Sequence, residues 1–209
     1  MATRTYRSPR REQAASDTRT AILDAAERLF ADQGYANTTV NQVAAEAAVA
    51  PNTVYTSVGG KPQLVVALAE RAAASPQIAS GLAEIDALTD GGDIIRLLAA
   101  GTTVTRRNQQ RAIAVMLDNV TADAVIAQTA ERIATLLRQR LHRIAARLNE
   151  IRALPDGMTT ARATAILWFY FSFTAWRELR ALGWTWKETE QWLAGQAINA
   201  LVRTAGPAV

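Results

Sequence analysis

The sequence predicts an all-α protein with about nine helices. Hydrophobic residues make up 49% of its 209 residues, while glycine and proline are scarce, at 11 and 6. Apolar residues recur at helical spacing, and the alternation typical of strands is almost absent. A chain of this length forms one domain or two small ones. We expect the chain to divide into three parts, residues 1–15, 16–74 and 75–209.

Four helices are expected in the first half of the chain. Gly34 supplies a stop for the first helix. The second opens on the capping-box pattern Thr39-Val-Asn-Gln42. The third has Pro51 at its first position, where a missing N–H costs nothing, and is so short that packing must hold it. We expect these helices over residues 16–32, 39–48, 51–58 and 61–74.

The remaining helices are expected to be longer. After a looser connection with two turn clusters, Asp93 is a candidate N-cap. Pro155 and Gly157 break the chain, Gly183 ends the next helix, and a second capping box begins at Thr185. We expect these helices over residues 93–106, 110–119, 121–150, 159–182 and from 185 onward.

The third helix is unusual in what it presents outward. Val54 can pack inward, which leaves uncharged hydrogen-bonding side chains such as Asn52, Tyr55 and Thr56 facing out. Two short helices joined by a tight turn form the helix-turn-helix arrangement, whose second helix enters the DNA major groove. Asn can pair with adenine edges, Thr with bases or phosphates, and a Tyr hydroxyl with a phosphate. The pattern therefore predicts a recognition helix.

Positive charges flank this predicted recognition helix. Lys61 opens the next helix at the positive end of its dipole, a placement that a bound phosphate would favour. Arginines crowd the first eleven residues, as in the basic arms of DNA-binding domains, although a solvated tail is an equal alternative. The predicted DNA contacts are Arg4, Arg7, Arg10, Thr38, Thr39, Gln42, Pro51, Asn52, Thr53, Tyr55, Thr56 and Lys61.

Residues 18–68 resemble the N-terminal domain of the tetracycline-repressor (TetR) family. The matching features are ILDAAERLFADQGY, the TTV that opens the second helix, the TVY of the third, and the K-x-x-L of the fourth. The resemblance implies a homodimeric, all-helical transcriptional regulator, most often a repressor. It also implies that residues 16–74 bind DNA and that residues 75–209 bind a ligand and dimerise. A two-fold dimer would match a palindromic operator in double-stranded DNA.

Three residues depart from the family pattern. The family usually has Gly at position 48, Ser or Thr at 50, and Phe at 58, where this chain has Ala48, Ala50 and Val58. A non-glycine residue in a left-handed turn costs about 1 kcal/mol, and loss of the cap costs about as much. We therefore expect a more mobile recognition helix than is usual in the family, with weakened affinity.

The C-terminal half carries surplus apolar surface. The segment 163–176 is apolar around its whole circumference, and the last helix is apolar on more than one face, which predicts a symmetric four-helix dimer interface. Interface candidates are Phe171, Trp192, Ile198, Leu201 and Val202. An apolar or aromatic ligand is expected between the helices, although Met and aromatic residues at this spacing also suit a plain core. Ligand candidates are Thr102, Arg106, Met116, Asn119, Trp168, Phe169, Phe173 and Trp176.

Other classes of function find little support in the sequence. Cysteine is absent, and the single His142 stands among arginines on a solvated helix face, so we expect no catalytic residue, metal or cofactor. The start is polar and basic, and no uncharged stretch exceeds about 14 residues, so we expect a cytoplasmic protein without a membrane span. The open alternative is a small-molecule-binding helical dimer with weakened or lost DNA binding. Residue patterns do not identify the operator, the effector or the regulated genes, and they do not distinguish a repressor from an activator.

Overall fold

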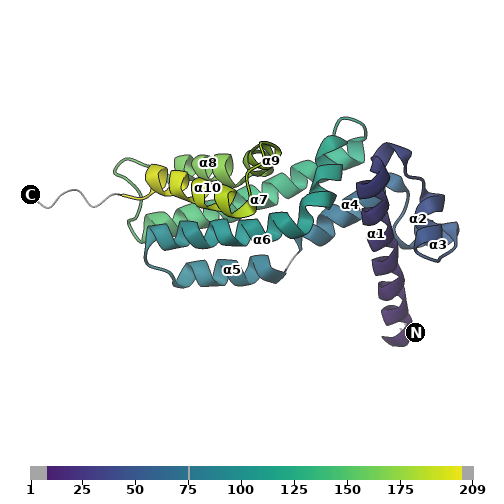
Figure 1. Cartoon of the computed structure of the whole chain (residues 1–209). Helices are drawn as coiled ribbons and strands as arrows, with labels where there is room; N and C mark the ends of the chain where they lie inside the picture. The colour runs from purple at the N-terminus through teal and green to yellow at the C-terminus, as the bar shows by residue number, and fades with distance from the viewer. Residues whose placement is uncertain (1–8, 75, 204–209) are drawn as a thin grey trace, which may run out of the picture. The chain divides into compact units, whose positions relative to one another are not determined.

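The structure is a computed structural model, and it describes residues 9–74 and 76–203. Within these residues the regular structure is entirely helical, as predicted, with one helix more than expected (Figure 1). The helices are α1 (Pro9–Asn37), α2 (Val40–Glu46), α3 (Pro51–Ser57), α4 (Lys61–Ala73), α5 (Pro76–Ala87), α6 (Gly91–Asp118), α7 (Ala124–Glu150), α8 (Thr160–Phe171), α9 (Phe173–Ala181) and α10 (Trp186–Leu201).

The chain divides into two compact units. The first unit takes the described residues up to Ala73 together with Gln110–Glu131, and the second takes Ala74–Gln109 and the residues from Arg132 onward. The helices α6 and α7 therefore each contribute to both units. One division point lies between Ala73 and Ala74, one residue before the boundary that the sequence predicts. The segment 110–131, which we had expected in the C-terminal domain, groups with the first unit instead.

The first unit is built on α1, which packs against α2, α3 and α4. Ile22 and Phe30 on α1, Val43 on α2, Val54 on α3 and Leu64 on α4 are all buried. The first helix is longer than predicted. It begins at Pro9, so the part of the expected flexible arm that the structure describes is helical.

Gly34 marks a kink rather than the end of the first helix. Its dihedral angles are φ 82° and ψ 158°, outside the helical region, and helical turns resume as far as Asn37. The stop that the sequence indicated is therefore a local bend. It is followed by Thr39, whose hydroxyl caps α2.

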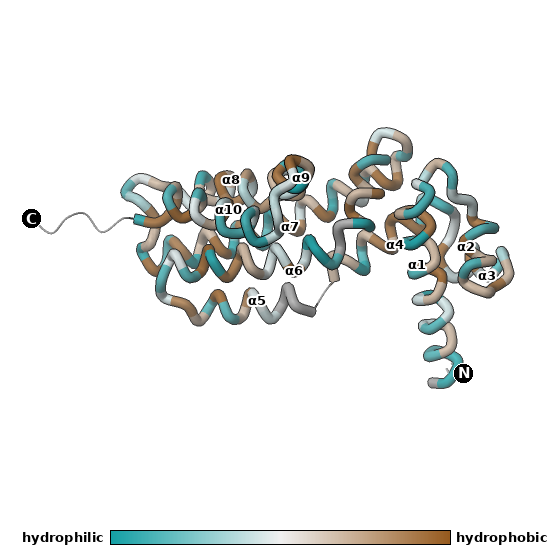
Figure 2. The backbone as a smooth tube through the Cα atoms, in the orientation of Figure 1, coloured by the Kyte–Doolittle hydropathy of each residue, from teal (hydrophilic) through white to brown (hydrophobic). Residues whose placement is uncertain are grey.

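The second unit has its core around α8, which packs on α9 and α10. The largest fully buried side chains there include Trp176, Phe171, Leu141 and Leu148. Hydrophobic residues recur along α8 (brown in Figure 2), and its buried residues are Ala163, Leu167 and Phe171.

Ser172 interrupts what we had predicted as one helix over 159–182. Its extended backbone (φ −67°, ψ 173°) separates α8 from α9. The interruption frees carbonyl groups at the end of α8, and two side chains bind them. The Trp176 Nε1–H donates to the Tyr170 carbonyl at 3.1 Å, and an Arg106 Nη2–H donates to the Phe171 carbonyl at 3.0 Å.

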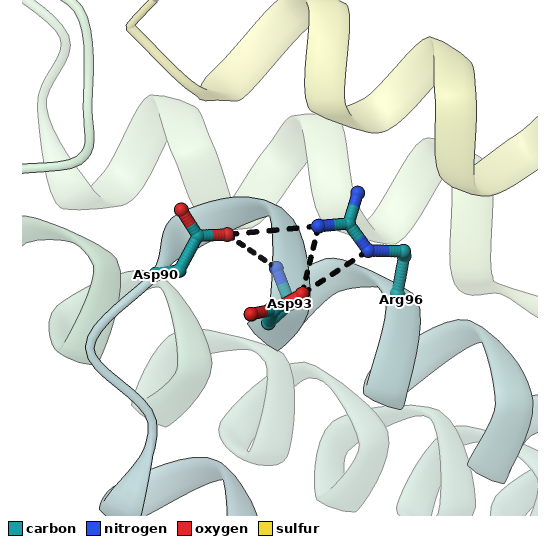
Figure 3. A network of polar contacts seen from close by, with 3 residues as sticks. All are labelled: Asp90, Asp93 and Arg96. Atoms are coloured by element: carbon teal, nitrogen blue, oxygen red, sulfur yellow. Dashed lines mark hydrogen bonds and ion pairs between the residues drawn. The ribbon is translucent and has the colours of Figure 1, made fainter.

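Two further expectations about helices in this half were wrong. The segment 75–92 is not a loose connection, because it contains α5, and α6 runs unbroken where two helices were expected. The first turn of α6 is capped by Asp90 rather than by Asp93. The Asp90 carboxylate accepts the Asp93 N–H at 2.8 Å, while Arg96 pairs with Asp93 at 2.7 Å (Figure 3).

Candidate nucleic-acid interface

The short helix α3 presents polar side chains outward, as predicted. Val54 is completely buried and anchors the helix against the first unit. Asn52, Tyr55 and Thr56 are exposed, and 54% of Tyr55 is accessible. A helix held by its buried face, with uncharged donors and acceptors outside, has the chemistry that base edges require.

The turn before α3 has the form of a Schellman motif. The Ala48 N–H donates to the Ala45 carbonyl at 3.1 Å, and the Val49 N–H donates to the Ala44 carbonyl at 2.9 Å. This motif places Ala48 in the left-handed region, at φ 54°. The strain expected from the missing glycine is therefore present in the backbone.

The other two departures from the family pattern, Ala50 and Val58, lie at the start and the end of α3. Ala50 stands at the N-cap and makes no side-chain capping bond, although Pro51 occupies the first helical position. Val58 closes the helix and is only half-buried. The next turn contains Gly59 at φ 116°, where an added Cβ would lie 2.9 Å from the Gln63 side chain. Glycine is therefore required there.

An arginine that sequence reasoning missed supports the end of α3. The Arg19 side chain on α1 donates a hydrogen bond to the carbonyl of Ser57, the last residue of α3. A cation at this end of a helix opposes the negative pole of the helix dipole. Its partner is 38 positions away in sequence, so no local pattern could reveal the contact.

Surface ion pairs link the other helices of the first unit. Arg28 on α1 pairs with Glu46 on α2 at 3.0 Å. Arg71 on α4 pairs with Asp24 at 2.6 Å and Glu27 at 2.8 Å, both on α1. These pairs lie at the surface, so each stabilises the fold only slightly.

Thr38 is not available for DNA, contrary to our prediction. Only 1% of this residue is exposed, and its hydroxyl donates to the Gly34 carbonyl at 2.8 Å and accepts from Gln33 Nε2 at 3.3 Å. Its side chain closes the bend after the kink in α1. The threonine was assigned from its place in the TTV stretch, which does not distinguish an inward from an outward side chain.

Thr39 and Gln42 are exposed and form the predicted capping box. The Gln42 N–H donates to the Thr39 hydroxyl at 3.2 Å, and the Thr39 N–H donates to Gln42 Oε1 at 2.8 Å. The box fixes the first turn of α2. It leaves both residues at the surface of α2, in the helix that precedes the recognition helix.

Lys61 is held close to the end of α1 rather than free in solvent. Its Nζ donates to the Ala36 carbonyl at 3.1 Å and lies 4.3 Å from the centre of the Tyr35 ring. Burial lowers the pKa of this amine. Two of the three ammonium hydrogens are left for another acceptor, which a phosphate oxygen could be.

The predicted basic arm is described only in part. Arg10 lies exposed on the first turns of α1. Arg4 and Arg7 lie outside the described residues.

The predicted ligand residues are not gathered in one compact unit. Met116 and Asn119 belong to the first unit and the other six to the second. Met116 is buried, while the Asn119 amide donates to the Val115 carbonyl at 2.8 Å. Both are thus accounted for by local packing and bonding.

In the second unit the six remaining ligand candidates differ in burial. Trp176 and Arg106 are buried, whereas Phe169 is 69% exposed and so does not line the interior of the domain. Trp168 is half-buried beneath the Arg138 guanidinium, 4.5 Å from the ring centre. Thr102 and Phe173 are also half-buried. The Thr102 hydroxyl donates to the Leu98 carbonyl at 2.8 Å, and the Phe173 ring lies against the Arg106 guanidinium.

Two of the predicted interface residues point into the core instead. Phe171 and Leu201 are fully buried within their own unit, so their side chains are not available to a second chain. Helical spacing alone did not separate the inner face of these apolar helices from the outer one. Trp192 is 43% exposed, and Ile198 and Val202 are half-buried.

The described residues offer no group of three or more His, Asp or Glu side chains that could hold a metal ion. No helix in the described ranges is both long and apolar enough to cross a membrane. His142, the single histidine, lies at the surface, and its Nδ1 is 3.2 Å from the Thr164 hydroxyl.

The two short helices α2 and α3, joined by a tight turn and packed on α1, form a helix-turn-helix arrangement. Residues 22–68 match the family model described as "Bacterial regulatory proteins, tetR family". The resemblance predicted from the sequence is thereby confirmed for this segment of the chain. Comparison with the curated proteins gave no match.

Solved structures share the fold over most of the chain. The SmeT–triclosan complex has a TM-score of 0.73 and 20% identity, covering 90% of this chain and 93% of that one. SmeT is the repressor of the Stenotrophomonas maltophilia multidrug efflux pump SmeDEF. NalD, the secondary repressor of the MexAB-OprM multidrug efflux pump in Pseudomonas aeruginosa, has a TM-score of 0.71 and 24% identity, covering 91% and 98%. At these identities the likeness is one of fold.

Proposed function

We propose that the chain is a sequence-specific transcriptional repressor that binds a palindromic operator as a homodimer and is released by a small apolar or aromatic ligand. The observation that carries the proposal is the exposed, uncharged face of α3 within a TetR-family domain. Such a regulator works in the cytoplasm, where it meets the chromosome.

Asn52 and Lys61 would have different roles on DNA. Asn52 lies in the first turn of α3, the part of a recognition helix that reaches base edges, and its amide suits adenine. Thr53, Thr56 and Tyr55 would add contacts to bases and phosphates. Lys61 would hold a phosphate at the first turn of α4, where the helix dipole is positive.

The dimer would form through exposed aromatic residues of the second unit. Phe169 on α8 and Trp192 on α10 expose large apolar surface, and Trp184 packs edge-on against Trp192 with ring centres 5.7 Å apart. These helices pack on each other within the chain, so a two-fold axis between two copies would unite four helices. Phe169 replaces the buried Phe171 and Leu201 in this proposal.

A ligand that releases DNA must favour a conformer whose two recognition helices no longer fit the operator. About 5.5 kcal/mol of differential affinity would turn a 1:99 ratio of conformers into 99:1. Support for an apolar or aromatic ligand comes from the buried aromatic residues of the second unit, and from a fold shared with a protein solved with triclosan.

A second function has one specific observation in its favour. Ala48 is strained and Ala50 lacks a cap, so α3 is held less firmly than a capped helix would be. A small-molecule-binding helical dimer that has lost DNA binding would tolerate both changes.

Fluorescence anisotropy with the intergenic duplex beside the chain's own gene tests the proposal. Tight binding to this duplex but not to a scrambled one, weakening steeply between about 50 and 200 mM salt, is the expected result. Equal or negligible binding to both duplexes, and to a pool of random duplexes, would favour the second function.

A further inference from the structure

Arg106 is an arginine whose side chain is buried in the second unit. Its exposed fraction is 9%, and it lies on α6, facing the junction of α8 and α9. Among the described residues, no carboxylate lies within ion-pair distance of its guanidinium. Its Nε–H is buried and makes no hydrogen bond. A buried charge in this state destabilises the free protein.

The surroundings of Arg106 are apolar on one side and polar on the other. The guanidinium lies 3.6 Å from the centre of the Phe173 ring and donates one hydrogen bond, to the Phe171 carbonyl. These two residues flank Ser172, where α9 begins. The Ser172 side chain is buried and makes no capping bond to α9. The guanidinium therefore binds the last carbonyl of α8, at the negative pole of that helix, and lies against Phe173, the first residue of α9.

Arg147, in the same unit, resembles Arg106 in its hydrogen bonds but has a carboxylate partner. Its Nε–H is also buried without a hydrogen bond, and its Nη2–H donates to the Leu88 carbonyl at 3.0 Å. However, Nη1 pairs with Glu150 at 2.9 Å, so its charge is compensated. Arg106 has the carbonyl contact and the unbonded Nε–H but lacks the anion.

Burial alone lowers the pKa of Arg106, to about 9, since no nearby charge acts on it. A residue that only had to cap the Phe171 carbonyl would not need a charge, because a neutral amide donor would bind that oxygen as well. The charge has a use if an anion completes the site.

We propose that Arg106 and the first turn of α9 form the anion-binding end of the effector site, and that the effector is a small carboxylic acid with an apolar body. This inference rests on the proposed function for its biological role. The planar guanidinium offers Nε–H and an Nη–H side by side, the geometry that binds a carboxylate in a bidentate manner. Phe173, Phe171 and Trp176 provide the apolar environment for the body of the acid.

The same environment argues for a carboxylate over a phosphate. Phosphate carries more charge at neutral pH and presents more oxygens than the buried donors of Arg106 and α9 could satisfy. A monocarboxylate matches the single uncompensated positive charge, and its apolar remainder is favoured by the aromatic residues.

Thermal unfolding of the full-length, DNA-free protein provides the test. The probes are benzoate and phenylacetate, each against its neutral isostere, benzamide and phenylacetamide, and inorganic phosphate is the third arm. At about ten times the dissociation constant, an acid should raise Tm by about 3 °C. Each amide and inorganic phosphate should leave Tm unchanged. Equal shifts for acid and amide, a shift with phosphate equal to that with the acids, or no shift with either acid up to about 10 mM would overturn the proposal.

Two variants locate the effect. Arg106→Met should abolish the acid-specific shift, whereas Arg147→Met, which removes an arginine with a similar carbonyl contact, should retain it. An acid-specific shift that survives in Arg106→Met would contradict the assignment. If Arg106→Met does not fold, Arg106→Lys takes its place, because lysine keeps the charge without the planar guanidinium. Arg106→Lys should reduce the acid-specific shift in Tm by at least half. An unchanged shift would contradict the assignment.

The readout is independent of DNA binding. A protein that fails to bind any duplex and still shows the acid-specific shift would refute the repressor proposal and leave the anion site intact. A protein that binds its operator but shows no acid-specific shift would refute the anion site and leave the repressor proposal intact.

Discussion

Arg19 on α1 donates a hydrogen bond to the carbonyl of Ser57, at the last residue of α3. Helix α3 thus has a cation at its C-terminal end, while its N-terminal end lacks a side-chain cap because Ala50 stands at the N-cap. We interpret Arg19 as the residue that compensates for the weak start of α3.

Replacement of Arg19 by alanine should loosen α3 without unfolding the first unit. A hydrogen bond and a dipole contact at this site contribute about 1 kcal/mol, which corresponds to roughly fivefold faster hydrogen exchange of the α3 amides. Arg28→Ala is the matched control, because it removes an exposed ion pair to Glu46 on α2 and should leave α3 exchange unchanged. Equal effects of both changes would show that Arg19 acts only through general stability.

Ala48→Gly should stabilise the protein. Ala48 has φ 54°, and glycine relieves the left-handed strain by more than it adds to the entropy of the unfolded chain. We expect a gain of about 0.5–1 kcal/mol in the free energy of unfolding, measured by urea titration. The control Ala45→Gly lies within the helical turns of α2 and should destabilise by about 1 kcal/mol. A loss of stability in Ala48→Gly would mean that the turn is not strained in solution.

Asn52→Ala tests base reading. If Asn52 contacts a base, the change should weaken binding to the operator by about 1–3 kcal/mol and leave binding to random DNA almost unchanged. Asn41→Ala, which removes an exposed amide from α2, is the control and should have little effect. Anisotropy titrations against both duplexes measure the difference. Equal losses on specific and random DNA would remove Asn52 from the base-reading residues.

Lys61→Ala tests the phosphate contact. Binding to all duplexes should weaken alike, and the slope of log affinity against log salt should flatten by about one unit. The chain offers a matched control in Lys187, an exposed lysine on α10 whose removal changes the net charge equally. The same flattening with Lys187→Ala would show that net charge, rather than a local contact, governs the slope.

Local signals in the sequence predicted several helix starts correctly. Capping boxes at Thr39 and Thr185, and Pro51 at the start of α3, act within one helical turn, and all three appear as expected. The strain at Ala48 was also predictable, because the Schellman turn requires a positive φ whatever the residue. These features depend on neighbours three or four positions away.

Features that depend on distant partners could not be predicted. The break at Ser172 has neither proline nor glycine, and it persists because Trp176 and Arg106 bind the carbonyls that it frees. The inward orientation of Thr38 likewise depends on the kink at Gly34. Apolar composition predicted that α8 is covered around its circumference, but within the chain Phe171 faces the core while Phe169 is exposed.

The exposed aromatic residues lead to a prediction about assembly. Trp192→Glu and Phe169→Glu each place a charge on the outer face of α10 or α8, where the proposed interface would bury it, so each should convert a dimer to a monomer in sedimentation velocity. Leu136→Glu is the control, because Leu136 is a similarly exposed apolar residue on α7, and it should leave the dimer intact. A monomer with full operator affinity would contradict the two-fold arrangement, since two half-sites would then be bound without a symmetric pair. Loss of the dimer together with loss of operator binding, while binding to random DNA persists, is the result that the proposed function requires.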